Sequence, residues 1–363
     1  MTMDKPAITV LIDTYNHERF IEEAIVSVLE QDFPASEMEI LVVDDGSTDR
    51  TPEIVQKFAP RVRYLCKENG GQASAFNFGI PQAQGEIVAF LDGDDWWAKA
   101  KLSTVVESFA ENPDIGTVGH GYHVTDEAGV LCQTVLPERK YRLNLRSPDE
   151  ASLFTQLQGF LGTSRMAYRR AILKRALPVP DVLRFEADEF IWTMAVAQAD
   201  TLVLDAPLFF YRLHAGNHFM GSSRDEARLR RRLDVMQGLL DHVPPGLRSL
   251  DVPQEIVDIV TTHTRIETKR LRLILDGGMP WETYSVEQEF LQRAYRSTTL
   301  GYRIYKQLSL LVALALPPRR FYQLRDWYAG NNLRRIRGAL GEPKPFAPIV
   351  ELPPQGLVRG ERH

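Results

Sequence analysis

Short apolar runs that end in clusters of acidic and polar residues are the feature that most constrains the fold of this chain. The runs Ile8–Ile12, Glu39–Val43 and Ile87–Leu91 are almost entirely apolar, as expected for strands that are covered on both faces. Each is followed by a stretch with apolar residues at helical spacing, such as Phe20–Leu29. Repeated strand–helix units predict an α/β fold with a parallel, doubly wound sheet.

Ligands of such sheets bind at the carboxyl ends of the strands. Here those ends carry Asp13–Asn16, Asp44–Ser47 and Asp92–Asp95. None of these turns has the glycine pattern of a dinucleotide site, and the chain contains no P-loop. If a diphosphate binds at this edge, something other than a glycine-rich loop must neutralise its charge.

The pattern changes beyond residue 113, and from about residue 224 it becomes mainly helical. Between these points we expect a hairpin of Ile115–His123 and Val130–Val135, a capped helix after Ser147, strands over Thr163–Tyr168 and Leu202–Leu213, and a helix centred on Trp192. The predicted organisation is an α/β domain over 1–220, a helical extension over 221–340, and a Pro-rich, disordered tail over 341–363.

Charge is distributed unevenly along the chain. Residues 1–223 carry a net charge of −12, whereas residues 224–340 carry +7. The acidic front half argues against nucleic acid as a partner unless a cation intervenes. The two separated cysteines fit a reducing cytosol, and we expect no signal peptide.

Asp92 and Asp94 follow the apolar run Ile87–Leu91. Two carboxylates at i and i+2 can reach one hard divalent cation, which can bridge two phosphates. An Asp-rich turn without a ligand is the simpler alternative, because Asp and Gly favour turns. The position at a strand end favours a metal site.

Asp44 and Asp45 form a second acidic pair at a strand end, where like charges repel. A carboxylate here could accept the imide N–H of a uracil or thymine ring. Ser47 and Asp49 are explained equally well as a turn and a helix cap.

Four motifs occur in order: TYNHERFIEEAIVSVLEQDF, EILVVDDGSTDRT, ENGGQASAFNFGI and VAFLDGDDWW. Together they resemble glycosyltransferase family 2, densely over residues 7–110 and loosely over 160–217. The resemblance implies a GT-A type fold, Mn²⁺ or Mg²⁺, and inversion at the anomeric centre. It also implies a nucleotide-sugar donor, a UDP- or dTDP-sugar.

The resemblance further implies site residues for the nucleotide and the metal. Thr14 and Tyr15 would hold the nucleobase, Asp45 its imide edge, Asp92 and Asp94 the ribose and metal, and Gly71, Ser74 and Asn77 the wall of the nucleotide site. Phe76 is a departure, because many relatives carry Arg there; Lys67 could supply the missing cation.

The second half must supply a general base that takes the proton of the acceptor hydroxyl. The family's Glu-Asp pair lies about four residues before a Trp, which places Asp188 on the Asp and Ala187 on the Glu. An acidic helix start favoured by the helix dipole is the alternative for this cluster. The segment that contains Arg212 and His214 resembles the family's strand that ends near the diphosphate. The resemblance implies that His214 is a metal ligand and that Arg212 contacts a phosphate.

The stretches Tyr302–Leu316 and Arg319–Leu340 combine apolar residues with arginines. A helix lying on a membrane surface fits this composition, and so does a helical subdomain that packs on itself or on a second subunit. The longest apolar run, Leu308–Leu316, is too short to span a membrane. We expect a cytoplasmic protein, with peripheral membrane contact through 221–340 as the open alternative.

The sequence therefore predicts an inverting, metal-dependent transferase with Asp188 as base and a hydroxyl of a surface glycan, polysaccharide or glycolipid as acceptor. Two alternatives remain. A nucleotidyltransferase would carry a Gly- and Arg/Lys-rich first turn, which DTYNHERF lacks. An inactive sugar-nucleotide-binding protein is suggested only by Ala187 and Phe76. Residues 120–185 carry no motif that names the sugar or the acceptor.

Overall fold

The computed structural model describes residues 6–214, 216, 225–294 and 300–330. The strands are β1 (Ile8–Thr14), β2 (Met38–Asp44), β3 (Arg63–Cys66), β4 (Ile87–Asp92), β5 (Trp96–Trp97), β6 (Ile115–Thr125), β7 (Leu131–Val135), β8 (Tyr141–Leu143), β9 (Ala167–Arg169) and β10 (Asp200–Arg212). The helices are α1 (Ile21–Leu29), α2 (Thr51–Gln56), α3 (Gln72–Gly79), α4 (Lys101–Glu111), α5 (Pro148–Leu157), α6 (Arg170–Ala176), α7 (Ala187–Gln198), α8 (Glu226–Ser249), α9 (Gln254–Leu275), α10 (Pro280–Ala294), α11 (Leu300–Leu310) and α12 (Pro318–Gly330).

One sheet runs in the order β3-β2-β1-β4-β9-β6-β10-β5, with β7 beside β6 and β8 beside β10. The first four strands are parallel, which confirms the predicted strand–helix units. The short strand β9 is antiparallel to both β4 and β6, so the sheet as a whole is mixed. The α/β fold class is confirmed, as is the hairpin of β6 and β7.

The parallel register brings the acidic turns together. Asp13 lies opposite Asp92 across β1 and β4, and Thr14 lies opposite Asp44 across β1 and β2. The core residues of β1 explain why this edge is fixed, since Val10, Leu11 and Ile12 have no exposed surface. Burial of such side chains contributes roughly 1.5–3 kcal/mol each, so the strand ends cannot shift easily.

The predicted strand over Thr163–Tyr168 is wrong in its first half. Thr163–Arg165 forms a 3₁₀ turn, and only Ala167–Arg169 pairs as β9. The turn places the hydroxyls of Thr163 and Ser164 where they bond carboxylates of other elements. These side-chain bonds stand where the predicted strand would have had backbone ladder bonds.

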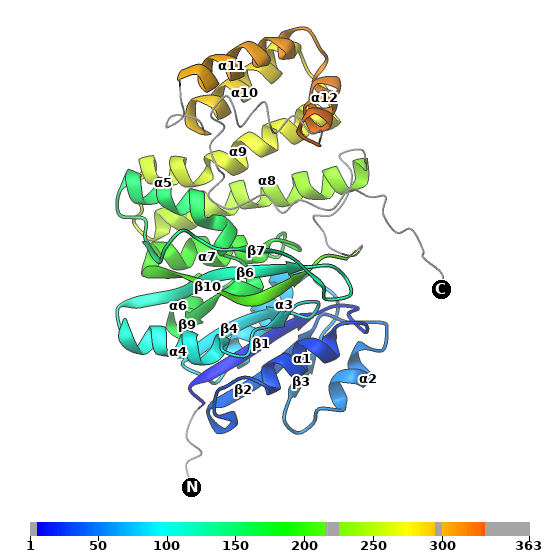
Figure 1. Ribbon diagram of the computed structural model, residues 1–363, viewed down its shortest axis with the longest axis vertical. Helices are drawn as coiled ribbons and strands as arrows, with labels where there is room; N and C mark the ends of the chain where they lie inside the picture. The colour runs from blue at the N-terminus through cyan, green and yellow to red at the C-terminus, as the bar shows by residue number, and fades with distance from the viewer. Residues whose placement is uncertain (1–5, 215, 217–224, 295–299, 331–363) are drawn as a thin grey trace.

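The helices α8 to α12 stack beyond the sheet at the upper end of the molecule (Figure 1). Residues of α8 and α9, among them Leu239, Val243 and Val257, belong to the same apolar core as the sheet. A second core lies farther out and includes Ile266, Leu310, Ala313, Phe321 and Tyr322. A buried ion pair of Arg270 with Glu287 (2.7 and 2.8 Å) joins α9 to α10.

None of the helices in the described ranges is both long and apolar enough to cross a membrane. The predicted tail 341–363 and Arg334, Arg335 and Arg337 lie outside the described residues.

Candidate active site

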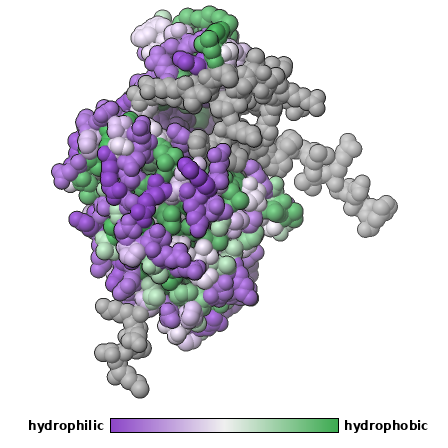
Figure 2. All heavy atoms as spheres, turned by 60° about the vertical axis from the view of Figure 1, so that its left-hand side comes forward, coloured by the Kyte–Doolittle hydropathy of each residue, from purple (hydrophilic) through white to green (hydrophobic). Residues whose placement is uncertain are grey.

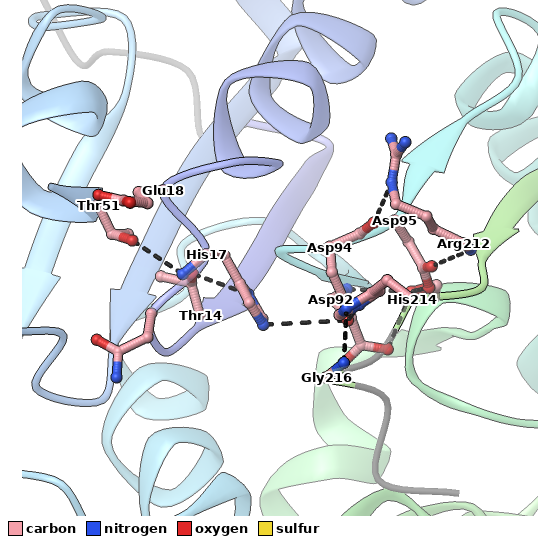
Figure 3. A network of polar contacts seen from close by, with 12 residues as sticks. Thr14, His17, Glu18, Thr51, Asp92, Asp94, Asp95, Arg212, His214 and Gly216 are labelled. Carbon is pink, nitrogen blue, oxygen red and sulfur yellow. Dashed lines mark hydrogen bonds and ion pairs between the residues drawn. The ribbon is translucent and has the colours of Figure 1, made fainter. Parts of the chain in front are cut away.

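The turn after β4 brings Asp94 against two histidines (Figure 3). Oδ2 of Asp94 lies 2.9 Å from Nε2 of His214 and 4.0 Å from Nε2 of His17. The N–H of Gly216 donates to Nδ1 of His214, so a neutral His214 carries its proton on Nε2 and donates to Asp94. Burial raises the pKa of Asp94, but His17 and His214 outweigh burial and hold this pKa below its usual value.

Arg212, at the end of β10, fixes the backbone of this turn. Its Nε donates to the carbonyl of Asp94 (3.1 Å), and its Nη1 donates to the carbonyl of Glu127 (3.0 Å). Nη2 pairs with Glu23, and the guanidinium lies 4.2 Å from the centre of the Trp96 ring. Because Arg212 is only 3% exposed, this arrangement gives it a positioning role. Its predicted contact with the nucleotide stays a prediction.

Ser164 lies between the other two carboxylates of the turn. Its hydroxyl lies 2.7 Å from Oδ2 of Asp95 and 3.1 Å from Oδ2 of Asp92, and it accepts the N–H of Asp92. Burial, then the neighbouring carboxylates, raises the pKa of Asp92 well above its usual value. Asp95 also accepts the N–H of Arg212 (3.1 Å), so Asp95 braces the turn.

Asp13 adds a further carboxylate to this edge. Its Oδ1 is buried and has no hydrogen-bond partner. Burial, then Asp94, raises the pKa of Asp13 to about 8. Such a group of carboxylates is costly unless a cation or proton compensates it.

Carboxylate oxygen and imidazole nitrogen together are donors that suit Mn²⁺ and other divalent ions. Asp94 and His214 thus carry donors of the kind the predicted metal takes, and an ion between them would replace the proton that Nε2 of His214 donates to Asp94; Asp92 lies in the same turn. Within the described part of the chain, no three or more His, Cys, Asp or Glu residues form a ready metal-binding group. Ligand phosphates would have to complete the coordination.

The acidic pair after β2 is neutralised locally. Asp44 accepts the Tyr64 hydroxyl (2.6 Å) and the N–H of Ser47 (2.8 Å). Asp45 pairs with Lys67 (Nζ to Oδ1, 2.7 Å). Separate donors therefore remove the repulsion that the sequence suggested.

Asp45 also accepts the N–H groups of Gly70 (3.0 Å) and Gly71 (2.7 Å). Its own N–H donates to the carbonyl of Thr14 (2.9 Å), so the ends of β1 and β2 are joined. Thr14 is buried, and its hydroxyl lies 3.2 Å from Nδ1 of His17, whereas Tyr15 is 44% exposed. The predicted base-binding residues Thr14, Tyr15 and Asp45 therefore lie together.

Two of the predicted wall residues, Gly71 and Asn77, contact the segment that leads to α7. Gly71 has φ +85°, and a Cβ there would lie 2.7 Å from backbone atoms of Arg184. Asn77 bonds both the N–H (2.8 Å) and the carbonyl (2.7 Å) of Val179. Ser74 lies against Gly70, where an added Cβ would come within 2.5 Å of the Ser74 hydroxyl. Their predicted contact with a nucleotide stays a prediction.

Phe76, where many relatives carry Arg, lies in the core and has an edge contact with Phe90, with ring centres 5.1 Å apart. Lys67 pairs with Asp45, one of the residues predicted to bind the base.

Asp188 lies in the first turn of α7. Its Oδ2 accepts the N–H (3.0 Å) and hydroxyl (3.1 Å) of Thr163, and its Oδ1 accepts the N–H of Glu189 (3.0 Å). Burial raises the pKa of Asp188. Its charge is close enough to Asp13 and Asp92 to raise the pKa of each. Asp188 thus belongs to the same carboxylate group as the turn after β4.

The flanking acids face the helical region. Glu189 lines a small cavity together with residues of α8 and α9, among them Leu239 and Thr261. Burial raises the pKa of Glu189 to about 8 and that of Glu186 to about 7, and Arg232 on α8 partly offsets both. Both acids thus have neighbours on the helical side of α7, although Asp188 is close enough to raise the pKa of each.

Four residues near the site were not predicted: His17, Gln72, Thr163 and Ser164. His17 and Gln72 lie inside the motifs, but their partners are distant in sequence, so spacing could not reveal the contacts. Thr163 and Ser164 lie in the 3₁₀ turn, where the sequence predicts a strand.

The family model for glycosyl transferase family 2 matches residues 9–177. An uncharacterized glycosyltransferase of Nostoc sp., alr2836, is 35% identical over 224 residues, which cover 60% of this chain and 67% of that protein. EpsJ of Bacillus subtilis, also an uncharacterized glycosyltransferase, is 33% identical over 218 residues, covering 57% of this chain and 61% of EpsJ. The matched regions thus span only about two thirds of these relatives.

The fold is similar to that of S. aureus TarS residues 1–349 in complex with UDP-GlcNAc, with a TM-score of 0.56, 22% identity, and coverage of 87% of this chain and 91% of that one. At this identity the likeness concerns the fold, and it agrees with the predicted GT-A type architecture. With the family match, the relatives and the order of the strand-end motifs, the chain belongs to glycosyl transferase family 2.

Proposed function

We propose that this protein transfers a sugar, with inversion, from a UDP- or dTDP-sugar to a hydroxyl of a surface glycan, polysaccharide or glycolipid. The observation that carries the proposal is the meeting of three groups at one edge of the sheet. These are the Asp45 carboxylate with its donors, the Asp94–His214 pair and Asp188. Sugar transfer needs neighbouring sites for the nucleotide, its phosphates and the acceptor hydroxyl, in that order.

The nucleobase occupies the region of Thr14, Tyr15 and Asp45 in this proposal. A carboxylate has about four lone-pair positions, and Lys67, Gly70 and Gly71 supply donors to Asp45. The N–H of Gly70 also reaches Oδ2 of Asp45 at 3.2 Å, and the imide N–H of uracil or thymine would take the place of this longer contact. Tyr15, being exposed, offers a ring for stacking.

Asp94 and His214 would hold Mn²⁺ or Mg²⁺, with Asp92 directed to the ribose or the same ion. Such an ion neutralises a diphosphate and stabilises its charge as it leaves. Arg212 contributes by fixing the Asp94 carbonyl and the Asp95 turn.

Asp188 is the proposed general base. Three donated hydrogen bonds orient its carboxylate and leave one acceptor position for a substrate hydroxyl. As the hydroxyl oxygen attacks the anomeric carbon, its proton passes to Asp188, and the bond to the nucleotide diphosphate breaks on the opposite face.

The acceptor class rests on similarity. TarS proteins of Staphylococcus aureus are named poly(ribitol-phosphate) β-N-acetylglucosaminyltransferases, and one is 28% identical over 225 residues, covering 59% of this chain. The sheet domain of residues 1–220 would carry the chemistry, and the extension 221–340 would support it.

The test is release of UDP from a panel of UDP-sugars with Mn²⁺, alone and with candidate acceptors. We expect slow hydrolysis without acceptor and faster release with the right one, and no release by Asp94→Ala. Lys57→Ala, at an exposed helix end, is the matched control. UDP binding without release from any donor would favour an inactive binding protein, and pyrophosphate release from UTP with a sugar phosphate would favour a nucleotidyltransferase.

A further inference from the structure

The far end of the helical region exposes a stripe of large apolar side chains. Leu300, Ile304, Leu308 and Leu311 are 70%, 51%, 62% and 50% exposed. Their spacing of four, four and three residues places them on one side of α11 and its 3₁₀ continuation. Figure 2 shows hydrophobic atoms gathered at the upper end of the molecule, where Figure 1 places α11. We call these four residues the α11 face.

Packing explains the other side of the same helix. Tyr302 and Leu310 are 0% and 4% exposed, and Leu310 lies in the second core with Phe321 and Tyr322. The helix is therefore held in place without the α11 face. Apolar side chains in a continuous exposed stripe usually mark an interaction surface.

The chain segment that carries the α11 face is basic, and on the adjacent helix α10 Glu287 pairs with Arg270 while Glu289 pairs with Arg265 and Lys269. Residues 300–325 contain five basic residues and no Asp or Glu. Arg303, Arg319 and Arg320 are exposed. Arg303 precedes Ile304 and so lies about 100° around the helix, at the border of the stripe. A long basic side chain in that place can reach a charged surface while its stem contacts apolar groups.

We propose that the α11 face docks on an anionic lipid surface, with Leu300, Ile304, Leu308 and Leu311 entering the interface and the arginines contacting lipid phosphates. The combination of an apolar stripe and flanking cations is what such surfaces bind. A second copy of this chain is a poorer partner, since a symmetric contact would bring the acid-free basic segments together. The helix lies on the surface, because none of the described helices can cross it.

The experiment is co-sedimentation of the full chain with phosphatidylcholine vesicles that contain phosphatidylglycerol, or none. We expect binding that requires the anionic lipid and weakens with salt. Ile304→Gln with Leu308→Gln should weaken binding about tenfold or more. Arg319→Glu with Arg320→Glu should do the same, because each cation near an anionic surface accounts for about a fivefold change.

Matched controls come from elsewhere on the surface. Lys174→Glu with Arg175→Glu reverses another exposed adjacent pair, and Leu131→Gln removes another exposed apolar side chain, so both should bind as the unmodified protein does. Melting temperatures and stabilisation by UDP, measured for every variant, identify any misfolded protein.

Three results would overturn the proposal: equal binding to neutral and anionic vesicles, equal losses in the α11 variants and their controls, or no binding at low salt. Self-association that Ile304→Gln with Leu308→Gln abolishes, without lipid binding, would assign the α11 face to a contact between copies.

Discussion

Replacing Asp188 by Asn tests the assignment of the base most directly. The substitution preserves size, but an amide offers one oxygen where the carboxylate offers two. Oδ2 receives two donors from Thr163, and Oδ1 receives the N–H of Glu189. The amide oxygen should therefore take the Oδ2 position and leave its NH₂ against the Glu189 N–H.

The cost in stability can be bounded from these contacts. One hydrogen bond to a charged group is lost, about 1.5–3 kcal/mol. Removing a negative charge beside Asp13 and Asp92 offsets part of this, since Asp188 raises the pKa of both. We expect a net loss in unfolding free energy of roughly 1–2 kcal/mol. Loss of a general base costs about 10²–10⁴ in rate, or about 3–5 kcal/mol of transition-state stabilisation.

The assay is UDP release under saturating donor and acceptor, with UDP affinity and melting temperature measured on the same protein. Asp188→Asn should lose kcat and keep its affinity for UDP. Glu189→Gln and Glu186→Gln are matched controls and should keep most activity, because both acids face the helical region.

The pH profile adds an independent check. A base works only when deprotonated, and burial raises the pKa of Asp188. Activity of the unmodified protein should therefore rise with pH, and the midpoint of this rise should lie above the pKa of an ordinary Asp. The residual activity of Asp188→Asn should not show this rise. An active Asp188→Asn together with a dead Glu186→Gln or Glu189→Gln would refute the reasoning and move the base by one or two positions.

Three further outcomes are expected. Asp45→Ala should weaken UDP by roughly 1–3 kcal/mol in calorimetry, and GDP should compete poorly with UDP; equal competition would remove the role in base recognition. Burial raises the pKa of Glu189 from 4.5 to about 8, so the folded chain retains a proton that the unfolded chain releases, and stability should fall as pH rises through that window. Melting temperatures measured across this pH range should fall less steeply for Glu189→Gln than for the unmodified protein, and an equal slope would contradict the assignment to Glu189. Arg212→Lys should lower the melting temperature and weaken Mn²⁺-dependent UDP binding, because one ammonium cannot replace contacts to Asp94, Glu127 and Glu23; normal metal dependence would count against its positioning role.

The local pattern of the sequence was sufficient for the parallel part of the sheet. Strands such as β1 and β4 are continuous apolar runs, and their polar ends follow from the chain itself. The pattern failed at Thr163–Arg165, where hydrogen bonds that Thr163 and Ser164 donate to distant carboxylates decide the conformation. The role of Arg212 was equally out of reach, because its partners Asp94, Glu127 and Glu23 come from three separate segments.

The contacts between α3 and α7 explain how one site is made from two halves of the chain. Gln72, in the first turn of α3, donates to the Thr163 hydroxyl (3.1 Å) and accepts the N–H of Ala187 (3.0 Å). Thr163 in turn donates to Asp188, while Gly71, one residue before Gln72, donates to Asp45.

The proposed base-binding carboxylate and the proposed catalytic carboxylate are therefore joined through consecutive residues, Gly71 and Gln72. A displacement of this loop would change both Asp45 and Asp188, because each depends on a donor that the loop positions directly or through Thr163. Gly71 cannot carry a side chain here, since a Cβ would meet the backbone of Arg184, and its φ of +85° disfavours other residues. In the proposed function, the motif ENGGQASAFNFGI would therefore couple donor binding to the position of the base, which a role as a wall of the nucleotide site alone would not require.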